Sequence, residues 1–272
     1  MSAPPAPSFF GATGAVSRLS LLRTLRGRKV RVASVAVAVV ILFPAVVALV
    51  KEDAETAEVV RAGIDWGFFR LLVFLLPILF VSGVVSEEVE GRTLHYLAMR
   101  PVPRASIALG KYAVGTLSAL GILWAGLLLL HLVGFAASPS LLVDELGATV
   151  RAGGAASLLL MNYCAICLFW GTLVPEAAGL LSVVWLGFIE WFLLLLPGVV
   201  RFVSMAHFAR ELGGLDRPGW DVLRNPLTGQ VVVQVPDVEL WVCGTVIGAE
   251  WILFLGLSLL IMQVSQLRFG KA

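Results

Sequence analysis

Six long apolar runs constrain the fold more than any other feature of the sequence. Each is close to the length of about 20 residues that an α-helix needs to cross a bilayer. Of the 272 residues, 59% are hydrophobic and 14% are charged, which excludes an ordinary soluble domain. We therefore predict an all-α membrane protein, because the runs lack the alternation of barrel strands. The predicted spans are 32–50, 67–85, 113–135, 153–174, 177–197 and 240–262.

Basic residues predict how these six transmembrane helices are oriented. The first run follows a basic cluster that comprises Arg18, Arg23, Arg26, Arg28, Lys29 and Arg31. Because such clusters favour the cytoplasmic side, the N-terminus is predicted to be cytoplasmic. Six crossings return the C-terminus, with Arg268 and Lys271, to the same side. Many of the acids, Asp65 among them, then fall in the predicted outer loops.

The predicted organisation is a leader, residues 1–31, and a membrane domain, residues 32–272. Between the arginines of the leader, apolar residues recur every three positions, at Val16, Leu19, Leu22 and Leu25. This pattern favours a basic amphipathic helix on the inner membrane surface, in contact with lipid, behind a disordered tail. A solvated basic leader is the alternative.

A long outer segment, 198–239, separates the last two spans and is too long for a simple connection. Its first part predicts an amphipathic helix on the outer interface that ends at Gly213-Gly214. Residues 231–235 are expected to be extended. The apolar positions of the helix are Val199, Phe202, Val203, Ala206 and Leu212.

The cytoplasmic stretch between spans two and three, residues 86–104, has a distinct charge pattern. Three acids stand at its start, where a helix N-terminus favours negative charge, and Arg100 stands near its end. Pro101 then stops the helix. Val89, Thr93, Tyr96, Leu97 and Arg100 share one face. The pattern predicts a short amphipathic helix over 86–100 that contacts a protein partner or the bilayer surface.

The same stretch resembles the permease subunits of type-2 ABC transporters, a family of exporters. The resemblance lies in Gly91-Arg92-Thr93-Leu94, Arg100-Pro101, Arg104 and the Gly110-Lys111 that opens the third span. It implies that 86–100 is a coupling helix that docks onto a separate ATP-binding subunit. By position, the contacts would be Glu87, Glu88, Glu90, Arg92 and Tyr96, and Pro101 would fix the angle of the helix.

The chain has no ATP-binding motif of its own. A phosphate-binding loop needs Gly-x-x-x-x-Gly-Lys-Ser/Thr, whereas Gly110-Lys111 is preceded at the required offset by Ala105 and followed by Tyr112. ATP and Mg are therefore expected on the partner subunit. The resemblance further implies a second permease, either a second copy or a homologue, and a bacterial cytoplasmic (inner) membrane.

Other functional classes find less support in the sequence. No His-Glu-x-x-His, Gly-x-Ser-x-Gly or paired aspartates occur within the spans, so we do not expect an enzyme. A net charge of +2 gives no basic field for nucleic acid. We interpret Cys164, Cys167 and Cys243 as apolar packing residues without a metal or disulfide role.

Four polar residues inside the spans are candidates for the substrate pathway: Glu190, Glu250, Asn162 and His131. The helical rise places Glu190 about 10 Å and Glu250 about 15 Å from the outer ends of their spans. The two acids are candidates to bind a cationic group or a proton. Alternatively, they are protonated and hydrogen-bonded between packed helices. A self-sufficient ion- or proton-coupled carrier that uses both acids is the alternative function.

Glycines within the spans predict close helix contacts. These residues are Gly121, Gly126, Gly171, Gly179, Gly187 and Gly256.

Overall fold

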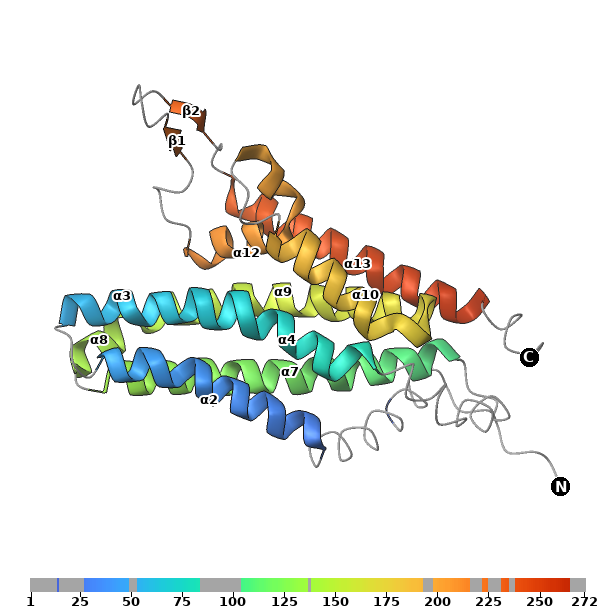
Figure 1. The fold of residues 1–272 in the computed structure, drawn as a ribbon, viewed down its shortest axis with the longest axis horizontal. Helices are drawn as coiled ribbons and strands as arrows, with labels where there is room; N and C mark the ends of the chain where they lie inside the picture. Colours follow the sequence, from blue (N-terminus) through green and yellow to red (C-terminus); the bar gives the residue numbers. More distant parts are fainter. Residues whose placement is uncertain are drawn as a thin grey trace.

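The computed structural model describes residues 14, 27–48, 53–83, 104–136, 138–192, 198–215, 222–224, 231–234 and 238–264 (Figure 1). Within these residues the chain forms a bundle of long helices and one short hairpin. The central helix is α9, Leu146–Leu173, which contacts helices on both of its sides. It carries many of the fully buried side chains.

The helices of the structure largely coincide with the apolar runs of the sequence. The first half contains α2 (Arg28–Ala48), α3 (Asp53–Gly63), the π-helical segment η1 (Ile64–Leu72), α4 (Val73–Pro77), the π-helical segment η2 (Ile78–Ser82), α7 (Arg104–Gly134) and α8 (Pro139–Asp144). After α9 come the 3₁₀ turn η3 (Pro175–Ala177), α10 (Ala178–Val184), the π-helical segment η4 (Trp185–Phe192), the 3₁₀ segment η5 (Gly198–Val203), α12 (Met205–Gly213), β1 (Val222–Arg224), β2 (Val231–Gln234) and α13 (Leu240–Val264).

Four helical segments of the described chain are long and apolar enough to cross a membrane. They are Thr56–Ser82, Ala105–Gly134, Leu146–Leu173 and Leu240–Val264. The remaining two apolar runs are also helical where they are described, in α2 and in α10 with η4. The crossing by six spans and the cytoplasmic location of both termini stay predictions. Most of the leader and all of the expected coupling helix lie outside the described residues.

Close packing of α2 depends on two glycines in the neighbouring helix. A Cβ atom at Gly67 would collide with Val40, and one at Gly63 would come within 2.7 Å of Pro44 Cγ. Only glycine therefore allows the backbone of α3 and η1 to approach α2 this closely. Both positions lie in the helix that continues into α4, so α2 is held against the second apolar helix along its C-terminal half.

The outer segment differs from its prediction as a surface helix. The expected single amphipathic helix is divided at Ser204 into η5 and α12, and α12 packs against α9 and α13. Burial of its residues 206–210 removes most of it from any aqueous interface. The predicted end is confirmed, since Gly214 adopts φ 70°. The expected extended strand is also confirmed, because β2 pairs antiparallel with β1.

Candidate functional site

Three of the four predicted polar residues gather around the middle of α9. Asn162 lies on α9, Glu190 on η4 and Glu250 on α13. Asn162 is completely buried and Glu190 is 1% exposed, whereas Glu250 is partly buried. We call Glu190, Glu250 and the α9 residues that bind them, Asn162 and Tyr163, the acid cluster.

The Glu190 carboxylate is held almost entirely through one of its two oxygens. Oε2 accepts hydrogen bonds from the Tyr163 hydroxyl at 2.8 Å, from Ser204 Oγ at 3.0 Å and from the backbone N–H of Ala206 at 3.2 Å. Ser204 Oγ also lies 2.8 Å from the backbone carbonyl oxygen of Glu190. These contacts tie η4 to α9 and to the start of α12.

Glu190 performs the capping role at the N-terminus of α12. The first N–H groups of a helix have no partner within the helix, and a negative charge there is favourable. Ser204 occupies the N-cap position, but its side chain makes no capping bond to α12. The carboxylate of Glu190 takes its place by accepting from Ala206 N–H. A charged residue in one apolar run therefore positions the helix that follows it.

Glu250 is bound from the neighbouring position of α9. Asn162 Nδ2 donates to Glu250 Oε2 at 2.7 Å, while the next residue, Tyr163, binds Glu190. Two adjacent residues of α9 thus bring together acids from two different helices.

A second hydrogen-bonded chain lies beside the acid cluster. Trp251 Nε1 donates to the Tyr112 hydroxyl at 2.7 Å, and that hydroxyl donates to the carbonyl oxygen of Met161 at 3.0 Å. Trp251 follows Glu250 in the sequence, and Met161 precedes Asn162. These two hydrogen bonds therefore connect the neighbourhood of the acid cluster to Tyr112 on α7.

A cluster of charged residues that the sequence did not predict joins η1 to α12. Asp65 Oδ1 lies 2.9 Å from Arg210 Nε of α12, and Asp65 Oδ2 lies 3.7 Å from Arg70. All three side chains are largely buried, and the Arg70 guanidinium also stacks over Trp66 at 3.9 Å. Asp65 lies within the helical segment from Thr56 to Ser82 and not in a loop, while its place on the outer side stays a prediction. Arg70 interrupts the predicted span 67–85, which is the signal that could have found the cluster.

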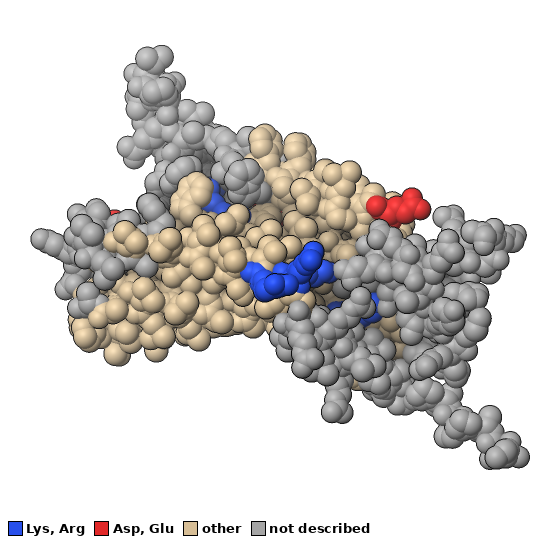
Figure 2. All heavy atoms as spheres, turned by 60° about the horizontal axis from the view of Figure 1, so that its bottom comes forward, with Lys and Arg blue, Asp and Glu red and all other residues tan. Residues whose placement is uncertain are grey.

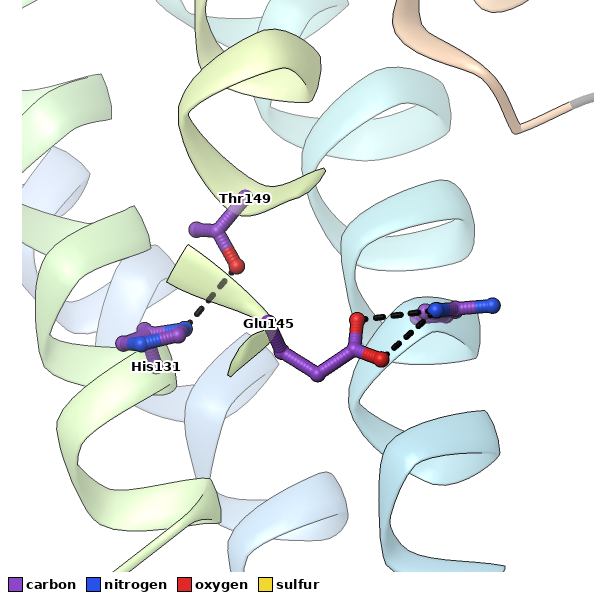
Figure 3. A network of polar contacts seen from close by, with 4 residues as sticks. His131, Glu145 and Thr149 are labelled. Carbon is purple, nitrogen blue, oxygen red and sulfur yellow. Dashed lines mark hydrogen bonds and ion pairs between the residues drawn. The ribbon is translucent and has the colours of Figure 1, made fainter. Parts of the chain in front are cut away.

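His131 lies away from the acid cluster and makes contacts between helices instead. Its Nε2 is 2.9 Å from the carbonyl oxygen of Leu142, to which it donates, and its Nδ1 is 2.9 Å from Thr149 Oγ (Figure 3). Thr149 and Asn162 are separated along α9 by about 20 Å at 1.5 Å per residue. Figure 3 also shows Glu145, which forms an ion pair of 2.7 Å with Arg61.

A cavity of about 160 Å³ lies beside Thr149 and beside the ion pair of Glu145 with Arg61. Arg151, at its edge, donates from Nε to the carbonyl oxygen of Leu212 at 2.8 Å, near the end of α12. No member of the acid cluster lines the cavity. Its lining is formed by Val60, Arg61, Ile64, Phe135, Glu145, Ala148, Thr149, Arg151, Ala152, Gly213, Gly214 and Leu215.

The remaining sequence candidates are placed as follows. The six expected docking residues, Glu87, Glu88, Glu90, Arg92, Tyr96 and Pro101, lie outside the described residues. Cys164, Cys167 and Cys243 are free and buried. Among the described residues, no group of three His, Cys, Asp or Glu side chains could hold a metal ion.

Comparison with known protein families decides the class of this bundle. Residues 24–181 match the family model described as ABC-2 family transporter protein, which covers more than half of the chain. The chain belongs to the ABC-2 transporter family. No curated protein matches its sequence. The family match includes the 86–104 stretch but ends before η4, so it does not include either acid of the cluster.

The surface of this ABC-2 family member agrees with an integral membrane protein. On the face that Figure 2 displays, most described side chains are neither acidic nor basic. Large apolar side chains are exposed along α2, α10 and α13, among them Val35, Leu180 and Ile252. Such extensive apolar exposure is costly in water and is expected in lipid.

Proposed function

We propose that this chain is the membrane-spanning permease subunit of an ATP-driven exporter. A separate ATPase subunit hydrolyses ATP, and a second permease, either identical or homologous, completes the transporter. In this proposal six helices cross a bacterial cytoplasmic membrane and both termini are cytoplasmic. ATP and Mg bind the partner subunit.

The family match over residues 24–181 carries the proposal. It includes the stretch 86–104, in which three acids, two Arg and a Tyr precede Pro101. We assign this stretch to the docking helix, because an amphipathic helix with a charged start fits a groove on a partner protein. The apolar surface of the described bundle supports the membrane part of the proposal.

Docking can be tested by co-purification with the ABC ATPase encoded in a neighbouring reading frame. We expect Glu87→Lys and Arg92→Glu to lose the complex and the dependence of ATP hydrolysis on the permease. Glu58→Lys is the matched control, because Glu58 is exposed on α3 and is not part of this stretch of the sequence. Retention of both the complex and the ATPase stimulation in the reversed variants contradicts the docking assignment.

The buried acids favour a second candidate, a self-sufficient ion- or proton-coupled carrier. Ionisable groups inside membrane helices are costly and are commonly functional, and Glu190 and Glu250 lie in the last two predicted spans. The two candidates differ in one measurable property. A carrier transports after reconstitution without an ATPase, whereas the permease does not.

A further inference from the structure

The acid cluster contains buried acceptor atoms that its own contacts do not use. Glu190 Oε1 and Asn162 Oδ1 are both buried, and neither has a hydrogen-bond partner among the described residues. Glu250 bonds to Asn162 through Oε2. An acceptor buried without a donor is costly, and native structures satisfy nearly all such atoms.

A donor, a cation or a proton on the Glu190 carboxyl can satisfy the two unsatisfied atoms. Tyr163, Ser204 and Ala206 already donate to Glu190 Oε2, so the carboxylate is fixed while Oε1 stays available. Asn162 donates one of its two amide N–H groups to Glu250, and its carbonyl oxygen has no hydrogen-bond partner among the described residues. Within the described chain, no Lys or Arg forms an ion pair with either acid of the cluster.

We propose that Glu190, Glu250 and Asn162 form a binding site for the primary ammonium group of a cargo molecule. An ammonium group offers three N–H donors and a positive charge. Glu190 Oε1 and Asn162 Oδ1 are unused acceptors, and Glu250, which Asn162 binds, adds a second carboxylate. The proposal rests on the proposed transport function, since it assigns the chemical class of the cargo.

A metal ion fits these residues less well than an ammonium group. Hard cations such as Ca²⁺ take six to eight oxygen ligands, whereas the cluster presents only three oxygen-bearing side chains, Glu190, Glu250 and Asn162. In the described part of the chain, no three acidic or imidazole side chains meet. A ligand with N–H donors and a single positive charge therefore suits the cluster better than a metal ion does.

Binding can be measured on the purified full chain in phosphatidylcholine nanodiscs, without any ATPase. The probe is dansylcadaverine, which carries a primary ammonium group and accepts excitation energy from tryptophan, and Trp251 adjoins Glu250. Two derivatives serve as matched ligands: an N-acetyl form without charge and an N-trimethyl form without N–H donors. Phosphatidylcholine has no net charge, so the bilayer does not attract the cationic probe non-specifically.

We expect saturable binding of dansylcadaverine and at least tenfold weaker binding of both derivatives. Glu250→Gln and Glu190→Gln should each weaken the parent probe at least tenfold, which corresponds to about 1.4 kcal/mol. Glu58→Gln, at an exposed position, should bind like the wild type. Because Glu190 also caps α12, Glu250→Gln keeps the test valid if Glu190→Gln fails to fold.

Three results would each overturn the site. They are wild-type affinity in Glu250→Gln, equal affinity for the N-acetyl derivative, and displacement of the probe by millimolar sodium chloride but not by choline chloride. The last result would assign the acids to sodium. None of these results depends on an ATPase, so failure of the ammonium site is separable from failure of the permease proposal.

Discussion

Replacement of Glu190 by alanine tests whether its carboxylate holds α12 in place. In the wild type, Oε2 is the acceptor for the Tyr163 hydroxyl and for the Ala206 N–H. Ser204 is different, because its hydroxyl can still donate to the backbone carbonyl of residue 190. The substitution therefore leaves two buried donors without an acceptor.

The expected loss of stability follows from these two donors. A buried donor without an acceptor costs about 1–3 kcal/mol, so Glu190→Ala should lower the free energy of unfolding by about 2–6 kcal/mol. For a chain of this size, that loss lowers Tm by about 4 °C or more. Glu190→Gln keeps an acceptor oxygen and should cause a smaller decrease.

The buried cysteines provide the assay. Cys164, Cys167 and Cys243 are each 0% exposed, so a thiol-reactive dye becomes fluorescent only when the helices separate. Thermal unfolding in detergent gives Tm for each variant. Glu250→Ala is the matched control, because it removes the acceptor of a single hydrogen bond, from Asn162. Its Tm should decrease less than that of Glu190→Ala.

Two results would refute the capping role of Glu190. One is a Tm of Glu190→Ala within 2 °C of the wild type, well inside the decrease of about 4 °C that the lower bound requires. The other is an equal decrease in Glu190→Ala and Glu250→Ala, since of the two acids only Glu190 accepts a hydrogen bond from α12 among the described residues. Either result would mean that the start of α12 is satisfied by other groups.

Three further substitutions test other contacts by the same unfolding measurement. Arg210→Gln leaves Asp65 without its closest cation and should cost about 3 kcal/mol, whereas no loss would mean that the pair is not buried. Tyr112→Phe removes a hydroxyl that both accepts and donates, so we expect a loss of about 1–2 kcal/mol and altered tryptophan emission. Gly67→Ala should cost about 1–3 kcal/mol by separating η1 from α2, while Gly121→Ala, which faces open space, should be neutral.

The helices were predictable because their length and apolar content are set by the bilayer. The π-helical segments and the inward packing of α12 were not predictable in this way. They depend on contacts between residues far apart in the sequence, such as Asp65 with Arg210. An amphipathic pattern shows that one face of α12 is apolar, but the same pattern suits a membrane surface and a protein interior equally.

Glycine illustrates the same limit. Gly126 makes the predicted close contact, since a Cβ there would lie 2.7 Å from Val37. Four other glycines predicted to do so have open space around them within the described chain, so they make no close contact there. A single sequence does not tell which side of a helix faces lipid and which faces another helix. The four are Gly121, Gly179, Gly187 and Gly256.

The candidate site was partly predictable for a simple physical reason. A carboxylate in an apolar run is rare enough to attract attention, and this rule found Glu190 and Glu250. The residues that fix them were missed, because Tyr163 and Ser204 are of types common in membrane helices. Arg70 was overlooked although it obeys the same rule as the acids. The juxtaposition of Asn162 with Glu250 required the structure.

The contacts of α12 connect Glu190 to the helix that follows it in the sequence. The helix is held at its start by Glu190, near its end by Arg210 on Asp65, and at its end by Arg151 on the carbonyl of Leu212. These partners come from η4, η1 and α9, so α12 moves only if several buried polar contacts break. Glu190 uses one oxygen for this task and leaves the other available. A cation bound at Oε1 would draw charge from the oxygen that caps α12, so ligand binding and the position of α12 depend on the same carboxylate.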